Sequence, residues 1–347
     1  MNFLIKTSLK ILTLTLSTLN PIASFADNFV NIYSYRQPAL LKPLLDAFTV
    51  QTGVNTRILF AKKGLGQRIN SEGENSPADV LLTVDIGRLE AAKTQGITQP
   101  VYSDIIVANI PPQYRDPDNH WFGVTTRARI IYASKERVQQ DSITYEELAD
   151  PKWKGRICTR SGQHVYSIGL IASMVAHFGE TKTTKWLKGV KNNLARKPTG
   201  NDRSQVKAIY SGECDIALGN TYYMGKMQTN TKEPEQKKWA SSVKLLFPNA
   251  KDRGTHVNLS GMVMAKYAPH IENAKKLMEF LSSAKAQHVY GSANYEYPVN
   301  PDIAADERTS SWGILKADSL SLSDIAKNRK TASELVDKIG FDNGPLL

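Results

Sequence analysis

The chain has 347 residues, of which 41% are hydrophobic and 22% are charged, and its formal net charge is +11 at pH 7. Such a length usually divides into two lobes, because single hydrophobic cores stop growing at about 250 to 300 residues. The excess of positive charge indicates either an ordinary solvated surface or a surface that attracts an acidic partner or an anion. The lysines are too scattered along the sequence to predict a nucleic-acid partner.

The first 26 residues have the pattern of a secretory signal peptide. Lys6 and Lys10 come before a short apolar run, and small residues stand just before a cleavage point after Ala26. The apolar run, residues 11–19, is about half of the roughly 20 residues that a membrane-spanning helix needs. We therefore expect residues 1–26 to be removed and the mature protein to be exported to the periplasm, not embedded in the membrane.

Short apolar runs alternate with helical patterns over the first hundred residues, which is typical of a sheet with crossover helices. The clearest helix begins near Pro38 and ends at Gly53, because Pro is favoured in a first helical turn and Gly after the last one. Its apolar residues recur at helical spacing: Leu41, Leu44, Leu45 and Phe48. Strands are predicted at 29–35, 54–61 and 78–85, and a further helix at 86–96.

Two long extended segments, FGVTTRARIIYAS (122–134) and THVNLSGMVMAKYA (255–268), are predicted to cross between the lobes. The first is longer than the usual five or six residues of a strand. Between them, the strands KGRICTR and CDIALGN alternate with helices to form a second α/β unit. We expect two α/β lobes joined by hinge strands, with a ligand in the cleft between them. The predicted limits are residues 27–125 with about 252–300 for the amino-terminal lobe, and 126–251 with about 301–347 for the carboxyl-terminal lobe.

The chain has two cysteines, Cys158 and Cys214. An even pair in an exported protein predicts one disulfide, with two buried free thiols as the alternative.

Several catalytic and nucleotide-binding patterns fail in this sequence. GNTYYMGK (219–226) has five residues, not four, between its first Gly and Gly-Lys, and Met227 follows where a P-loop needs Ser or Thr. The six histidines lack the spacing of a zinc site, and no GxSxG nucleophile elbow occurs. We therefore expect a binding protein and not an enzyme.

Three tyrosines remain as candidates for ligand contact. Tyr222 and Tyr223 directly follow the predicted strand CDIALGN, and Tyr166 follows the strand KGRICTR. Open α/β sheets place ligand-binding residues at the carboxyl ends of their strands. Neutral phenols would stack on an organic ligand or donate hydrogen bonds to it, whereas ionised phenols suit a hard cation such as Fe(III). Ordinary core packing is the third interpretation.

At these tyrosines the sequence resembles the periplasmic ferric iron-binding proteins that supply ABC importers, the bacterial transferrin-like family. The similarity extends over nearly the whole chain after the leader. It is carried by IYSYRQPALLKPLLDAF, SPADVLLTVDIGRL, WFGVTTRARIIYAS, NLARKPTGNDRSQVKAIYSGECDIALGN, TYYMGK and GTHVNLSGMVMAK. The resemblance implies the type II periplasmic-binding-protein fold, with two α/β lobes and a hinge.

The resemblance also implies that Tyr166, Tyr222 and Tyr223 bind ferric ion from the carboxyl-terminal lobe. Many members of the family add a histidine, and some a further tyrosine, from the segment after the first strand. This chain has Gln37 and Pro38 there. It is therefore more similar to members that complete the iron site with water or with a small anion such as carbonate.

Donors for such an anion are expected from the opposite face of the cleft. Tyr35 and Gln37 lie at the end of the first strand, and Arg127 lies in the crossing segment, two positions before Arg129. An arginine suits a planar oxyanion because its fork donates two parallel hydrogen bonds. We therefore assign the anion to Tyr35, Gln37 and Arg127. The alternative is that Arg127 and Arg129 form ordinary ion pairs between the lobes.

The resemblance implies a monomeric solute-binding protein that captures Fe(III) by lobe closure and delivers it to an inner-membrane ABC permease. A binding protein for a small organic or oxyanion ligand is the alternative function, with the tyrosines stacking on that ligand or donating hydrogen bonds to it.

Overall fold

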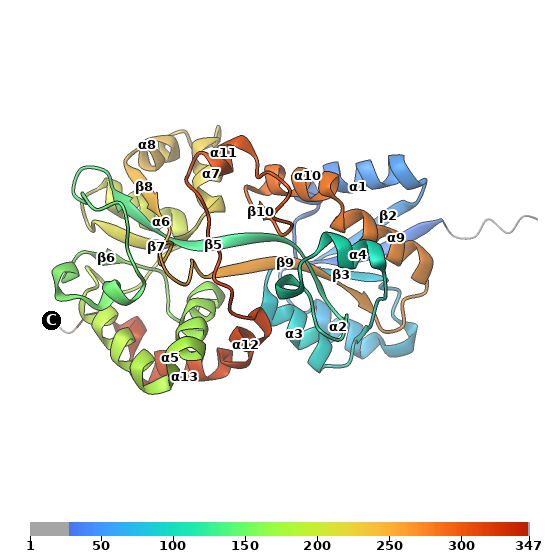
Figure 1. The fold of residues 1–347 in the computed structure, drawn as a ribbon, viewed down its shortest axis with the longest axis horizontal. Helices are drawn as coiled ribbons and strands as arrows, with labels where there is room; N and C mark the ends of the chain where they lie inside the picture. The colour runs from blue at the N-terminus through green and yellow to red at the C-terminus, as the bar shows by residue number, and fades with distance from the viewer. Residues whose placement is uncertain (1–27, 346–347) are drawn as a thin grey trace, which may run out of the picture.

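The computed structural model describes residues 28–345, so the predicted signal peptide at 1–26 lies outside the described residues. Two groups of helices lie at the two ends of an elongated molecule, and long strands run between them (Figure 1). Within the described range, no helix is both long and apolar enough to cross a bilayer.

The group at one end begins with alternating strands and helices, as the sequence predicts. Its elements are β1 (Phe29–Ser34), α1 (Pro38–Thr52), β2 (Asn55–Phe60), α2 (Leu65–Glu72), β3 (Val80–Thr83), α3 (Ile86–Thr94), β4 (Thr98–Gln99) and α4 (Asp104–Asn109). Strand β1 lies between β2 and β3 and is parallel to both. Helix α1 has Pro38 in its first turn and buries Leu41 and Phe48, and Gly53 ends it with φ 71°, a left-handed conformation that favours glycine. These features confirm the predicted bounds of this helix.

Two strands connect the ends of the molecule. The first half of β5 (Phe122–Ser134) pairs with β9 (Val257–Ala265), and its second half pairs with β7 and β8. Strand β9 also pairs with β3, so the strand order is β2-β1-β3-β9-β5-β7-β6. All residues of β5 and β9 are buried. Both predicted crossing segments are therefore strands that link the two groups of elements (Figure 1).

The group at the other end is the second α/β unit. It contains β6 (Ile157–Cys158), α5 (Val165–Asn192), α6 (Asp202–Tyr210), β7 (Ile216–Asn220), α7 (Tyr222–Gln228), α8 (Glu235–Ser241) and β8 (Val243–Leu246). The predicted strand KGRICTR is only two residues long in the structure, because β6 pairs with β7 at two positions. Gly179 interrupts the helical backbone of α5 with φ 76°, so two helical stretches follow one another in this element.

The last part of the chain packs against both groups of elements. Helices α9 (Ile271–Ser282) and α10 (Ala284–Asn294) pack on α1, and β10 (Tyr297–Pro298) pairs with β5. After α11 (Glu307–Ser310), helices α12 (Leu322–Lys327) and α13 (Arg329–Lys338) pack on α5. We call the end with β1–β4, α1–α4, α9 and α10 the amino lobe, and the end with α5–α8 and α13 the carboxyl lobe. The residue limits of the two lobes given above stay a prediction.

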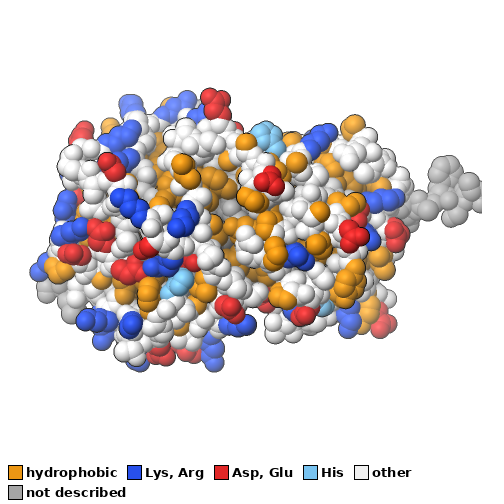
Figure 2. Space-filling model, viewed as in Figure 1, with side chains coloured by type: hydrophobic (Ala, Val, Ile, Leu, Met, Phe, Trp, Pro, Cys, Tyr) orange, Lys and Arg blue, Asp and Glu red, His pale blue; other side chains and the backbone are white. Residues whose placement is uncertain are grey.

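The surface charge is dispersed. On the face drawn in Figure 2, Lys and Arg side chains are spread among acidic and uncharged ones over both lobes. The net positive charge is therefore distributed on this face and not concentrated in one patch.

The predicted disulfide is present. Cys158 in β6 and Cys214, just before β7, are bonded with their Cα atoms 5.9 Å apart, and both are buried. The bond joins two neighbouring segments of the carboxyl lobe beside the strand that leads to Tyr222.

Candidate functional site

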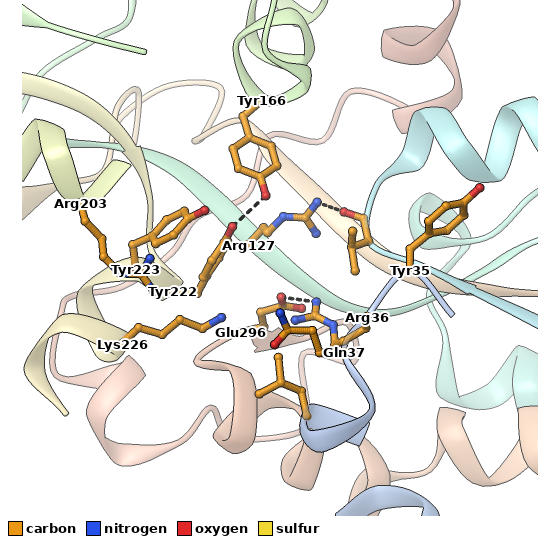
Figure 3. Close-up of a pocket in the computed structure, with 12 residues that line it drawn as sticks. Tyr35, Arg36, Gln37, Arg127, Tyr166, Arg203, Tyr222, Tyr223, Lys226 and Glu296 are labelled. Carbon is orange, nitrogen blue, oxygen red and sulfur yellow. Dashed lines mark hydrogen bonds and ion pairs between the residues drawn. The ribbon is translucent and has the colours of Figure 1, made fainter. Parts of the chain in front are cut away.

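A cavity of about 360 Å³ lies between the two lobes and contains all six predicted ligand-binding residues (Figure 3). Its polar lining comes from both sides. The residues around it are Tyr35, Arg36, Gln37, Leu40, Val84, Arg127, Tyr166, Arg203, Tyr222, Tyr223, Lys226 and Glu296.

The three phenols predicted as ligands lie together on the carboxyl-lobe side of this cavity. Tyr166 is in the first turn of α5, and Tyr222 and Tyr223 begin α7. The hydroxyl oxygens of Tyr166 and Tyr222 are hydrogen-bonded at 2.9 Å, and the ring centroids of Tyr222 and Tyr223 are 4.3 Å apart. Figure 3 shows the hydroxyl groups of Tyr166 and Tyr222 pointing toward each other. Residues 56 positions apart thus present their oxygens to one point.

Buried contacts fix the backbone that carries Tyr222 and Tyr223. The hydroxyl of Tyr132 donates to the carbonyl of Asn220 at 2.6 Å, and the Thr221 N–H donates to the Ala128 carbonyl at 3.1 Å. A Cβ at residue 219 would collide with the ring of Tyr132, so glycine is needed there for the ring to lie under the strand. The end of β7, and with it the start of α7, is therefore held on two sides.

The environment of Tyr222 and Tyr223 opposes ionisation of their phenols. Burial raises the pKa of Tyr222 well above its usual value, and the neighbouring Tyr166 and Tyr223 raise it further. Burial and Tyr166 also raise the pKa of Tyr223. Burial likewise lowers the pKa of Lys226 to about 8, and Arg36 adds to that effect. A strong local positive charge is therefore needed to ionise Tyr222 and Tyr223 at neutral pH.

The amino-lobe side of the cavity is a short segment that follows β1. Gln37 is exposed, whereas Arg36 is buried and donates to Glu296 at 2.7 Å and to Asn294 at 2.7 Å. Although burial opposes the charged carboxylate, Arg36 and Arg127 hold the pKa of Glu296 below its usual value. Arg36 is therefore already neutralised by a carboxylate of its own lobe.

Tyr35 lines the cavity, but its hydroxyl does not face the phenols of the carboxyl lobe. Its side chain points away from the phenols of the carboxyl lobe (Figure 3). Its hydroxyl accepts the Gly66 N–H at 3.1 Å, and the guanidinium of Arg88 lies 4.0 Å from the centre of its ring. Tyr35 thus lies between this cavity and a second one lined by Lys63, Gly66 and Arg88.

The two arginines of the crossing strand have different partners. Arg127 donates from Nη2 to the carbonyl of Val84, while its buried Nη1 has no hydrogen-bond partner among the described residues. Arg129 forms an ion pair with Asp202 at 3.0 Å. Arg129 is therefore ion-paired within the carboxyl lobe, and not between the lobes as the alternative had it, whereas Arg127 keeps an unpartnered donor.

Four polar residues of the cavity were not assigned to the site from the sequence: Arg36, Arg203, Lys226 and Glu296. Lys226 and Arg203 lie on the carboxyl-lobe side, with their charged groups 5.0 Å from the Tyr222 ring centre and 5.1 Å from the Tyr223 ring centre. The helical spacing of Lys226 after Tyr222 was a usable signal, because residues four apart lie on one face of a helix. Glu296 carried no such signal.

The side chains of the cavity favour a hard metal ion, or a ligand that carries negative charge. Among residues 28–345, no group of three or more His, Cys, Asp or Glu side chains could hold a metal ion. The three phenols are the clustered oxygen donors of this cavity, which the oxygen-bearing side chains of Tyr35, Gln37 and Glu296 also line. The cationic side chains of Arg127, Arg203 and Lys226 line the same cavity. Such a site suits a ligand that makes the phenols anionic or brings negative charge of its own.

A model of the family described as bacterial extracellular solute-binding proteins matches residues 75–315 of this chain. The chain is also similar to Iron uptake protein A1 of Synechocystis sp., at 45% identity over 314 residues, which cover 90% of this chain and 87% of that protein.

Two solved structures are similar over nearly their whole length. Ferric iron-binding protein A of Mannheimia haemolytica, in an open conformation, is 48% identical with a TM-score of 0.87, covering 91% of this chain and 99% of that one. A Trichodesmium protein in complex with iron and citrate ligands is 41% identical with a TM-score of 0.87, covering 90% of this chain and 99% of that one.

Proposed function

This chain belongs to the bacterial extracellular solute-binding proteins, among their ferric iron-binding members, and from that premise we propose that it captures Fe(III) in the interlobe cleft with tyrosinate ligands. As a periplasmic solute-binding protein it binds its ligand without converting it. The proposal extends to delivery of the ion, by a monomer, to an inner-membrane ABC permease.

The convergence of three phenols at one point of the cleft carries this proposal. The oxygens of Tyr166 and Tyr222 are 2.9 Å apart, and Tyr223 stands beside them. Ionised phenols are hard oxygen donors, which suit a hard trivalent cation. Three phenolates together neutralise the three charges of Fe(III). The ion would supply the field that removes their protons, against the burial that raises the pKa of Tyr222 and Tyr223.

A small anion such as carbonate would complete the iron site from the other side of the cleft. The unpartnered Nη1 of Arg127 supports this, since a buried guanidinium donor favours an acceptor with negative charge. Gln37 is exposed at the cavity and supplies a neutral donor. Tyr35 accepts from Gly66, so its own O–H hydrogen stays available, although its ring points away from the phenols.

Capture would then proceed by lobe closure about β5 and β9. The carboxyl lobe presents the phenols, and closure brings the amino-lobe segment after β1 onto the anion and excludes water from the ion. Exclusion of water strengthens every charged interaction in the site. Protonation of the anion would remove its charge and give a route for release.

A visible absorption titration tests the proposed site. Metal-free mature protein is titrated with ferric citrate, and a phenolate-to-iron charge-transfer band is expected to saturate at about one equivalent. The same titration of Tyr222→Phe is expected to give no such band, because the most buried phenol is lost. A colourless wild-type protein would overturn the proposal and favour an organic or oxyanion ligand, which mass spectrometry of the purified protein would then identify.

A further inference from the structure

One carboxylate behind the tyrosines connects the elements that carry them. Asp202 is the first residue of α6, is 0% exposed, and does not line the cavity. It accepts three hydrogen bonds: from the Asn220 N–H at 2.9 Å, from Arg129 Nη1 at 3.0 Å and from Arg160 Nη1 at 2.9 Å. The carboxylate also lies at a helix N-terminus, where the helix dipole favours a negative charge.

Two of these donors lead directly to the phenols. Asn220 ends β7 and stands two residues before Tyr222. Arg160 stands in the segment that enters α5, six residues before Tyr166, and its guanidinium lies 5.2 Å from the centre of the Tyr166 ring. The two tyrosine-bearing segments come from different parts of the chain, and Asp202 contacts both.

The third donor joins this group to the crossing strand. Arg129 in β5 bonds to Asp202 and also donates from Nη1 to the side-chain oxygen of Asn220 at 3.2 Å. Arg129 is 2% exposed, so loss of the carboxylate would leave a buried cation without its counter-charge. Asp202 thus fixes the end of β7 against both β5 and the segment before α5.

We propose that Asp202 is a positioning residue for the iron site, which holds the phenol of Tyr166 and those of Tyr222 and Tyr223 at binding distance before the ion arrives. This inference rests on the proposed function. Partners behind the ligands of a metal site commonly orient those ligands, and their loss typically lowers metal affinity about 10- to 100-fold. Asp202 acts here through the backbone and Arg160, and it touches no ligand oxygen.

The opposite end of β7 offers a matched control. Asp215, the residue before β7, also accepts from two arginines, Arg137 and Arg156, but it lies at the end of the strand that leads away from the phenols. Asp202→Asn and Asp215→Asn make the same chemical change, the first beside the end of β7 that leads to the phenols and the second beside its other end. Comparison of the two separates loss of a doubly paired carboxylate from loss of ligand positioning.

The test compares wild type, Asp202→Asn, Asp215→Asn and Tyr166→Phe. For each variant, thermal unfolding checks the fold, the charge-transfer band is measured per bound iron, and ferric affinity is measured in competition with citrate. We expect Asp202→Asn to bind iron at least about tenfold more weakly than Asp215→Asn. Its band should be weaker and shifted toward that of Tyr166→Phe. Stability alone would not change the band per bound iron.

Equal affinity and equal bands in Asp202→Asn and Asp215→Asn would overturn the inference while leaving the proposed function intact. Absence of the band in both wild type and Asp215→Asn would overturn the proposed function itself. If Asp202→Asn does not fold, Arg160→Gln removes one link and leaves the Arg129 ion pair in place, with Arg156→Gln as its control. An Arg160→Gln protein with a wild-type band and affinity would then overturn the inference.

Discussion

The two faces of the cleft are built in different ways. On the carboxyl-lobe face, Tyr222 is 7% exposed, and the strand before it is fixed by Tyr132 and Asp202. On the amino-lobe face, Gln37 is exposed and lies in a short connection between β1 and α1. The comparison indicates that the carboxyl lobe presents a fixed cluster of phenols, whereas the amino lobe presents an exposed, neutral polar side chain on a short connection.

Loss of one phenol from the carboxyl-lobe face should lower ferric affinity the most. Tyr166→Phe removes a ligand oxygen and the 2.9 Å contact to Tyr222, so we expect ferric affinity to fall by more than about 100-fold. The charge-transfer band per bound iron should also weaken. Competition titrations against citrate measure this change. Tyr210→Phe, at a half-exposed tyrosine on α6, is the control and should bind iron like wild type.

Lower pH should weaken iron binding, because protons compete with iron for the phenols of the carboxyl-lobe face. Burial and the neighbouring phenols raise the pKa of Tyr222 and Tyr223, so both are protonated in the metal-free protein at neutral pH. Each must lose its proton to bind iron, and the affinity therefore falls as pH falls. We expect at least about two protons to be released per iron at neutral pH, one each from Tyr222 and Tyr223. Proton release measured in weakly buffered solution tests this, and release of none would contradict phenolate ligation.

Replacement of Arg127 tests the proposed anion site. Arg127→Gln replaces the buried guanidinium with a shorter, neutral polar side chain. We expect a loss of about 10- to 100-fold in ferric affinity, because the anion loses its counter-charge. The dependence of wild-type affinity on added bicarbonate should disappear in this variant. Unchanged affinity together with unchanged bicarbonate dependence would remove Arg127 from the anion site.

Gln37 should have the smallest effect of the four. It is an exposed, neutral side chain, and a neutral hydrogen bond contributes about 0.5–1.5 kcal/mol net. Gln37→Ala should therefore weaken binding by about two- to tenfold, with the charge-transfer band preserved. A loss as large as that of Tyr166→Phe would instead mean that the amino lobe supplies a ligand of the same rank as the phenols.

Local patterns in the sequence predicted most of the framework. The apolar spacing of Leu41 and Phe48 defined α1, and the run from 122 to 134 defined β5 with its full length. Tyr222 and Tyr223 were found because a ligand-binding position follows the carboxyl end of a buried strand. These predictions succeed because helical spacing, strand length and terminal Pro or Gly act over a few neighbouring residues.

The side chains around the phenols depended on contacts that no local pattern records. Arg127 and Arg129 stand two positions apart in one strand, yet one keeps a free donor at the cavity and the other is paired with Asp202. Sequence spacing put both on one face and could not assign their partners. Tyr35 was expected at the anion, but its hydroxyl accepts a hydrogen bond from the N–H of Gly66, at the start of α2.

The sequence by itself thus determined the α/β class, the two crossing strands, the paired cysteines and the three phenols, because each depends on residue type and short-range order. Only the tertiary structure decided which charges are neutralised and which remain available. Arg36 meets Glu296 across 260 positions and Arg129 meets Asp202 across 73. Such pairs form when distant segments are packed together, since a buried charge needs a partner wherever the fold brings one within reach.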